Sequence, residues 1–288
     1  MNKTQRSASA VIEPEFAAAP FGEVSAVRRT GEGRYAAEIA PGWDAMGNTD
    51  GGYLLAVAAR AISEETGRDP VTITAHYLAP VSHGPVVVQT HSHKTGKGLS
   101  TAGATLTFEG RPSMVVIGSF GSIEDEAEVM LQDAEPLVLP TTPEESLRVL
   151  PQPGQPMPPP FTDKVDIRLH PDDAGFLLGR PSGTAQMRGW FRLGPDQPWD
   201  AAGLLLAADA FPPTVFNASL PVNWTPTIEL TVHLRALPHT EFVKMQYRTR
   251  FIGNGRLEVD GLIWDEYNRL CAQSRQLALV PRASSQAG

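Results

Sequence analysis

Residues 51–62 read GGYLLAVAARAI, and residues 201–211 read AAGLLLAADAF. Each stretch is apolar on nearly every side of a helix, and such a helix has to be buried almost all round. Asp200 precedes the second stretch as an N-cap candidate, and Pro212-Pro213 is expected to end it. The sequence therefore predicts two buried central helices, one in each half of the chain.

Each helical stretch is followed by a strand in which apolar and polar residues alternate. The first strand covers residues 72–80 and the second covers residues 227–235. His233 follows His76 by 157 residues, and this spacing supports an internal duplication. Shorter strands are expected before each helix, at 24–29, 34–40, 165–169 and 184–193, and further strands with glycine-containing turns follow each helix.

Two short strands, one central helix and several long antiparallel strands form the order of a hot-dog fold. The predicted fold class is α+β, a double hot-dog in which two antiparallel sheets each wrap around a central helix. Pairing the two copies edge to edge would join them into one continuous sheet and remove two exposed sheet edges. The sequence thus predicts one body made of two related halves.

A proline-rich segment separates the halves. Nine prolines occur from Pro136 to Pro160, and an acidic run precedes them. Proline removes backbone donors and fixes φ, so this segment cannot form a central strand or a long helix. We expect a linker over residues 124–162, hot-dog units over 21–123 and 163–283, and a loose N-terminal arm over 1–20.

The composition limits the partners. Lys and Arg total 24 against 32 for Asp and Glu, a net charge of −8, which argues against nucleic-acid binding. No run approaches the roughly 18 apolar residues of a membrane span, and Glu13 and Pro14 interrupt the N-terminal stretch, which argues against a signal peptide. Cys271 is the single cysteine, so no intrachain disulfide is expected and a cytoplasmic location is the simplest prediction.

Asp209 is the most informative candidate for chemistry. It lies among alanines and leucines of the second helical stretch, where burial would raise the pKa of a carboxylate. The alternative is that Asp209 lies on an exposed stripe of the helix or caps the Pro212-Pro213 turn. The two interpretations differ in whether the carboxylate is buried.

Polar residues of the following strands are weaker candidates. Thr227 opens the second alternating strand, on the face that alternation gives to Glu229 and Thr231, and its hydroxyl could hold a water molecule. Gln276 in the last strand could orient that water, with Gln273 and Ser274 as competitors. Ordinary strand residues are the alternative in each case.

The Gly51-Gly52 pair opens the first helix, where backbone N–H groups can receive a negatively charged oxygen. A tight turn with a helix cap is the alternative. His91 and His93 share a strand face, but without a third ligand cluster no metal site is predicted.

From about residue 20 to 283 the sequence resembles the double hot-dog acyl-CoA thioesterases and is similar to acyl-CoA thioesterase II. In the first half the resemblance is carried by residues 48–54 and 75–81, with Tyr77 in place of the usual Phe. In the second half it is carried by residues 206–209, 226–230 and 272–276. The long linker and the stretch from Phe211 to Thr214 depart from the best-studied enzymes.

The resemblance implies hydrolysis of an acyl-CoA without a covalent intermediate. Asp209 would act as the base, and Thr227 and Gln276 would position the water. N–H groups near Gly51 and Gly52, or near Gly203 in the second half, would stabilise the oxyanion. If the last strand is shifted, Ser274 and Gln273 are the alternatives to Gln276. The acyl chain would lie between the two helices, with Trp190, Trp199 and Trp224 at the mouth.

Coenzyme A would then be part of the substrate, and neither a cofactor nor a metal is expected. A homodimer or higher homo-oligomer is expected because outer sheet edges remain. Two other functions stay open. One is a non-catalytic acyl-thioester binding protein, and the other is an enoyl-thioester hydratase or dehydratase. The absence of His from both helical stretches disfavours the hydratase.

Overall fold

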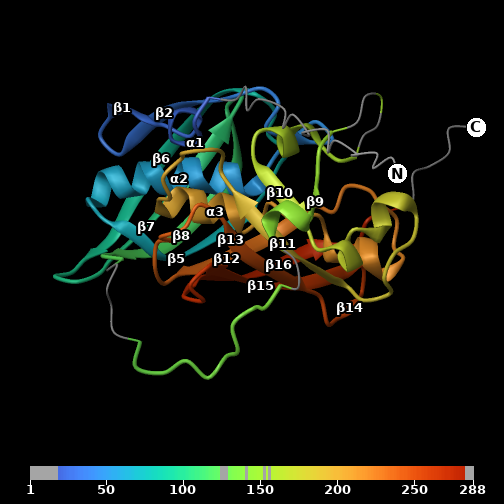
Figure 1. Ribbon diagram of the computed structural model, residues 1–288. Helices are drawn as coiled ribbons and strands as arrows, with labels where there is room; N and C mark the ends of the chain where they lie inside the picture. The colour runs from blue at the N-terminus through green and yellow to red at the C-terminus, as the bar shows by residue number, and fades with distance from the viewer. Residues whose placement is uncertain (1–18, 124–128, 140–141, 152–153, 155–156, 283–288) are drawn as a thin grey trace, which may run out of the picture.

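The computed structural model describes residues 19–123, 129–139, 142–151, 154 and 157–282, so the predicted N-terminal arm lies almost wholly outside the described residues. Helices α2 (Gly51–Thr66) and α3 (Ala201–Ala207) pack against each other on one face of a long antiparallel sheet (Figure 1). This arrangement confirms the predicted α+β double hot-dog. Within the described ranges, no helix has the length and apolar character needed to cross a membrane.

The sheet contains 14 strands in the described part of the chain, and the order of strands outward from its centre is similar in the two halves. The first half has the spatial order β1-β2-β6-β7-β8-β5, and the second continues as β12-β16-β15-β13-β11-β10-β9. The strands of the first half are β1 (Arg28–Gly31), β2 (Arg34–Ile39), β5 (Asp69–Tyr77), β6 (Gly84–Thr95), β7 (Ser100–Phe108) and β8 (Arg111–Gly121). Those of the second half are β9 (Leu147–Arg148), β10 (Asp166–Leu169), β11 (Gln186–Arg192), β12 (Thr227–Leu234), β13 (Val243–Arg248), β14 (Ile252–Gly253), β15 (Arg256–Asp265) and β16 (Leu270–Leu279).

Shorter elements connect these strands. A hairpin, β3 (Asp44–Ala45) and β4 (Asn48–Thr49), stands apart from the long sheet, before α2. The remaining short helices are α1 (Phe21–Val24), η1 (Pro143–Glu145), η2 (Pro160–Asp163), η3 (Pro171–Asp173), η4 (Gly175–Leu178) and η5 (Thr214–Ala218).

The halves meet where β5 pairs with β12. At the centre of this pair Thr74 lies opposite Thr231, and their hydroxyls share a hydrogen bond of 2.8 Å across a separation of 157 residues. On either side, His76 pairs with Glu229 and Thr72 pairs with His233. Adding 157 to the first-half residue of each pair gives the second-half residue of the other pair, so the register is that of a local two-fold axis. The spacing noted in the sequence thus corresponds to a structural repeat.

The second central helix is shorter than predicted. We expected it to continue to Phe211, but α3 ends at Ala207 and the chain continues as a tight turn, with Asp209 N–H donating to the Leu206 carbonyl at 3.1 Å. Pro212 and Pro213 lack N–H groups, and the residue before a proline disfavours helical geometry. Asp209 therefore lies in the turn after α3, neither on an exposed helical stripe nor within the helix.

The beginning of the first half also differs from the prediction. The strand expected at residues 24–29 starts only at Arg28, because α1 extends to Val24 and the next three residues form a turn and a short irregular connection. Phe21 of α1 is buried and packs against Trp43 and Tyr53, with ring centroids 5.4 and 5.9 Å apart. This aromatic cluster ties α1 to α2.

The last part of the predicted linker is integrated into the second half. Residues 124–128, 140–141, 152–153 and 155–156 lie outside the described residues. Near the end of the range, β9 pairs with β10, and the side chains of Val149 and Phe161 are buried. The segment therefore packs as structure as well as connecting the two halves.

Gly52 permits the close packing of α2 on α3. A Cβ atom at this position would lie 2.8 Å from both the Leu205 and the Leu206 carbonyl oxygens. We predict that Gly52→Ala lowers the free energy of unfolding by about 1–3 kcal/mol or more, because backbone atoms cannot yield as a side chain can. Denaturant unfolding measures this change. Glu64→Ala, an exposed change on the same helix, should stay within about 0.5 kcal/mol, and equal effects would contradict the account.

Candidate active site

A cavity of about 320 Å³ lies where the two halves meet, and it is lined mainly by apolar side chains. The N-terminal turn of α2 and the turn after α3 form one side of it. The linker end near residues 157–162 and the segments around Phe176 and Phe216 form other walls. Four polar side chains of particular interest lie in the lining: Asp50, Asp209, Thr227 and Gln276. An apolar chamber with a few convergent polar groups is typical of a small-molecule site.

Three of the predicted residues form one hydrogen-bonded cluster. The Gln276 amide nitrogen donates to Asp209 Oδ1 at 2.7 Å and to Thr227 Oγ1 at 2.6 Å. These residues come from the turn after α3, the start of β12 and the middle of β16. The structure therefore brings Asp209, Thr227 and Gln276 together, as the sequence hypothesis requires.

Thr227 reaches the cavity through a β-bulge. Simple alternation predicted that Thr227 shares a face with Glu229 and Thr231, and this prediction was wrong. Opposite β16, Thr227 pairs with Ala278 while Glu229 pairs with Leu277, so one additional residue of β12 is accommodated between them. A bulge changes the face of the residues beyond it. Thr227 is thereby turned to the inner face that carries Gln276.

The first turn of α2 encloses the Asp209 carboxylate. A Cβ atom on Gly51 would lie 2.6 Å from Asp209 Oδ2, so only glycine allows this approach. The backbone N–H groups of Gly52 and Gly51 donate to the carboxylate. The Tyr77 hydroxyl donates to the Gly51 carbonyl at 2.8 Å and fixes the turn from the opposite side. The positive end of the α2 dipole therefore faces Asp209.

The surroundings of Asp209 raise its pKa. Removal of the carboxylate from bulk water raises the pKa to about 6, although the hydrogen bonds from Gln276, Gly52 and Gly51 act in the opposite direction. The side chain keeps partial exposure because it faces the cavity. A carboxylate with a pKa of about 6 is ionised at neutral pH and can still accept a proton, which is what a general base requires.

Asp50 is a second carboxylate in the cavity that the sequence reasoning missed. It is the N-cap of α2, and its Oδ1 accepts from the Tyr53 N–H at 2.9 Å. Its side chain is buried, and burial together with the negative charge of Asp209 raises its pKa well above the usual range. An Asp directly before two glycines at a helix start was the signal available in the sequence.

Two of the predicted residues are not brought to the cavity. The Gly203 N–H donates to the Asp200 cap at 2.7 Å, and Gly203 packs against Leu193 and Trp199. Ser274 faces the same side of β16 as Gln276 but lies beside Tyr247, outside the cavity lining. Its competitor Gln273 accepts a hydrogen bond from Arg235 on an exposed face.

The mouth and the channel also differ in detail from what we expected. Trp224 lines the cavity, but Trp190 and Trp199 do not. The cavity lies at the ends of the two helices rather than along the groove between them, because α2 and α3 are in direct contact.

The N-terminus of α3 is the counterpart, in the second half, of the N-terminus of α2 at the cavity. An ion pair occupies this second corner of the helix pair. Asp200 caps α3 as Asp50 caps α2, but it faces Arg60 in the second half of α2, with Nη2 and Oδ2 2.7 Å apart. Arg60 also donates to Ser25 Oγ at 2.8 Å. Where one corner holds two carboxylates, the other holds a carboxylate and a guanidinium. Within the described residues, one of the two related helix N-termini therefore lines a polar part of the cavity, and the other forms an ion pair.

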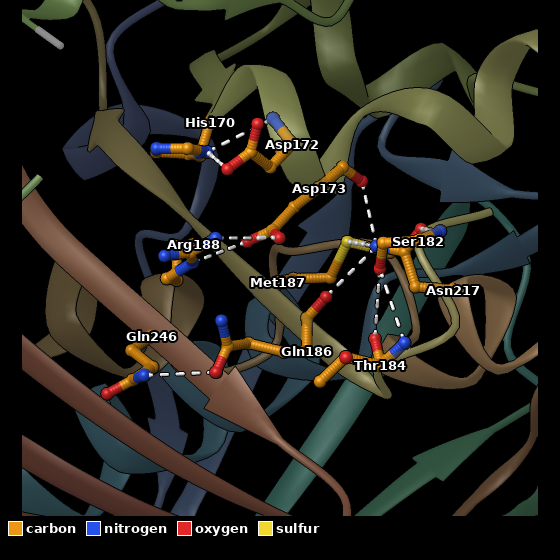
Figure 2. Close-up of polar contacts among 10 residues, drawn as sticks. All are labelled: His170, Asp172, Asp173, Ser182, Thr184, Gln186, Met187, Arg188, Asn217 and Gln246. Carbon is orange, nitrogen blue, oxygen red and sulfur yellow. Dashed lines mark hydrogen bonds and ion pairs between the residues drawn. The ribbon is translucent and has the colours of Figure 1, made fainter. Parts of the chain in front are cut away.

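A polar network around the buried residues Asn217 and Asp173 joins several short segments of the second half (Figure 2). The Asn217 amide donates to the carbonyls of Asp173 and Gln186 at 2.8 and 3.0 Å, and its oxygen accepts from the Ser182 N–H. Arg188 forms a two-pronged ion pair with Asp173 (Figure 2). These contacts join η3, β11 and η5 and so position the adjoining wall residues Phe176 and Phe216, whose rings lie 5.6 Å apart.

The described residues contain no group of three metal-ligating side chains placed to hold an ion. His91 and His93 lie on an exposed stretch of β6.

A continuous antiparallel sheet over two paired helices, with an Asp, Gln and Thr cluster at one helix end, defines a double hot-dog protein of thioesterase type. The comparisons with known proteins give the same result. The profile of the acyl-CoA thioesterase N-terminal domain matches residues 39–121, and that of the acyl-CoA thioesterase C-terminal domain matches residues 143–280. The chain belongs to the acyl-CoA thioesterase family.

Similar proteins include a structure from Thermobifida fusca assigned as thioesterase II, 32% identical, with a TM-score of 0.81, over 91% of this chain and 97% of that one. An uncharacterized protein of Mycobacterium tuberculosis is 27% identical over 85% of this chain and 90% of its own length. The acyl-CoA thioesterase II TesB2 of Mycobacterium marinum shares the fold at 16% identity and a TM-score of 0.67, over 92% of this chain and 99% of that one.

The raised pKa of Asp209 has a consequence for stability. Between the unfolded pKa of about 4 and the folded value of about 6, the folded state holds the proton more strongly, so stability falls as the pH rises through this window. Asn at this position cannot ionise. We predict that urea unfolding of Asp209→Asn, compared with the parent, shifts in favour of the variant by about 1–3 kcal/mol between pH 4 and pH 7.5.

The control is Asp133→Asn, which changes an exposed carboxylate of the linker. Its stability difference from the parent should not vary with pH. Parallel curves for Asp209→Asn and the parent would contradict a raised pKa at Asp209.

Proposed function

We propose that this protein hydrolyses acyl-CoA thioesters to a free acid and coenzyme A by direct attack of water. The observation that carries the proposal is the cluster of Asp209, Gln276 and Thr227 at an apolar cavity, with the pKa of Asp209 raised to about 6. Asp209 accepts the proton of the attacking water, and Thr227 and Gln276 hold that water in position. Coenzyme A is part of the substrate, and no cofactor takes part.

The helix end supports charge development on the substrate. The first-turn N–H groups of Gly51 and Gly52 are the candidates for binding the oxyanion, in competition with the Asp209 carboxylate that they contact in the free protein. The acyl chain would lie against the apolar walls of the cavity, with Trp224 at its mouth. We infer a cytoplasmic location and a homodimer or larger homo-oligomer as parts of the same proposal.

A non-catalytic acyl-thioester binding protein is the alternative, since the same cavity could hold a ligand without turning it over. A hydratase or dehydratase is disfavoured because the cavity lining, within the described residues, includes no histidine. The hydrogen-bonded cluster favours hydrolysis over simple binding, because it places a carboxylate that can accept a proton beside two groups, Thr227 and Gln276, that can hold a water molecule.

An assay with a panel of acyl-CoA thioesters tests this proposal, with free thiol detected by a thiol reagent. We expect release of free thiol, with activity decreasing below about pH 6 as Asp209 becomes protonated. Asp209→Asn should lower turnover at least about 100-fold, since general bases contribute roughly 10²- to 10⁴-fold.

Gln276→Leu should also reduce turnover strongly, because it removes both hydrogen bonds that join the cluster. Gln273→Leu is the matched control on the opposite face of β16 and should leave turnover unchanged. Thermal stabilisation by acyl-CoA without thiol release would favour the binding protein. A change in enoyl absorbance without thiol release would favour the hydratase.

A further inference from the structure

Asp50 is positioned to act in the same cavity as Asp209. The residue is only 7% exposed, and it lines the cavity beside Gly51. The residue is held in place, since its own N–H donates to the Trp43 carbonyl and its Oδ1 accepts from the Tyr53 N–H, both at 2.9 Å. A carboxyl group fixed in this way faces the ligand space rather than bulk water.

The two carboxyl groups share one helix turn. The Gly52 N–H is a hydrogen-bond donor to both Asp50 and Asp209. Gly51 directly follows Asp50, and a Cβ atom added to Gly51 would lie 2.6 Å from Asp209 Oδ2. Two buried carboxylates this close repel each other when both are ionised. Such a pair titrates as a unit and holds one proton over a wide pH range.

The hydrogen bonds indicate which member holds the proton. Asp209 accepts from Gln276 and from two backbone N–H groups, whereas Asp50 accepts from two backbone N–H groups, so the ionised form of Asp209 is supported by one more hydrogen bond. Burial and the charge of Asp209 raise the pKa of Asp50 well above the usual range. Tyr77 of β5 and Tyr247 of β13 lie close enough to both carboxylates to be affected by their charges, and Glu229 of β12 lies close enough to affect Tyr77. None of these three is a cation, so none favours a second negative charge.

We propose that Asp50 is the general acid of the reaction and delivers its carboxyl proton to the sulfur of the leaving thiol. This inference rests on the proposed thioester hydrolysis. Water oxygen forms the new bond to the carbonyl carbon while one water proton moves to Asp209. The C–S bond then breaks, and the sulfur takes the proton of Asp50. The products are a carboxylic acid and a thiol, and the pair again holds one proton, now on Asp209, which returns to Asp50.

The need for an acid comes from the leaving group. An alkyl thiol has a pKa near that of free Cys, about 8.5, so its thiolate is basic enough to gain from a proton at neutral pH. An aryl thiolate such as thionitrobenzoate is stable without one. The dependence on leaving group therefore separates an acid at Asp50 from a residue that only caps a helix.

The experiment compares Asp50→Asn with Asp200→Asn. Both replace the N-cap aspartate of a central helix by asparagine, which is also a good N-cap, but only Asp50 lines the cavity. We expect Asp50→Asn to lower turnover of acyl-CoA about 100-fold and turnover of an acyl thionitrobenzoate less than about threefold. Asp200→Asn should change neither rate by more than about twofold.

The dependence of kcat/KM on pH is a second readout, because a purely structural role of Asp50 would leave it unchanged. In the parent, kcat/KM should rise through about pH 6 as Asp209 ionises and fall at higher pH as Asp50 ionises. Asp50→Asn should keep the first limb and lose the second. Equal losses with both leaving groups, an unchanged profile, or parent-like turnover of acyl-CoA by Asp50→Asn would each overturn the proposal.

Titration of the carboxyl groups followed by carbon NMR keeps the test independent of turnover. The Asp50 signal, identified with Asp50→Asn or, if that variant does not fold, Asp50→Ser, should remain protonated at pH 7. An Asp50 carboxyl that ionises near its ordinary value of about 4 would overturn the proposal whatever the enzyme hydrolyses. If the parent released no thiol from any acyl-CoA, the proposed function would fail, and the titration would still show whether the two carboxyls share a proton.

Discussion

The contact between the first turn of α2 and the turn after α3 is the constraint on which the site depends. It joins a helix of the first half to a carboxylate of the second, and it exists because Gly51 and Gly52 carry no side chains. Gly52 lets the backbone of α3 approach, and Gly51 lets Asp209 reach the helix N-terminus. Neither half alone has both the N–H groups and the carboxylate.

Duplication explains the architecture, and divergence explains why the two ends of the helix pair differ. The sheet register around Thr74 and Thr231 retains a two-fold relation, and both helices keep an aspartate N-cap. At the far end Arg60 neutralises Asp200, whereas at the cavity Asp209 adds a second negative charge beside Asp50. An ion pair in one corner and a mutually repelling carboxyl pair in the other are opposite electrostatic outcomes from equivalent positions.

The sequence was sufficient to predict those features that depend on periodicity and hydrophobicity. Two apolar helices, alternating strands and a spacing of 157 residues indicate the double hot-dog, and the polar residues Asp209, Thr227 and Gln276 are recognisable as candidates within that pattern. Features that depend on a single backbone irregularity could not be predicted in the same way. The bulge that turns Thr227 inward breaks the alternation that located it, and the end of α3 before Asp209 follows from the local turn. Asp50 was missed because a helix cap explains an aspartate at that position equally well.

A crystal structure with a non-hydrolysable acyl thioether of coenzyme A tests the central claim most directly. The account predicts that the sulfur and the first acyl carbons lie at the helix end formed by both halves, between Asp50 and Asp209, with the acyl chain toward Phe176 and Phe216. Binding at the Arg60 and Asp200 corner, or within one half away from Gly51, would contradict the claim that the contact between the halves forms the site.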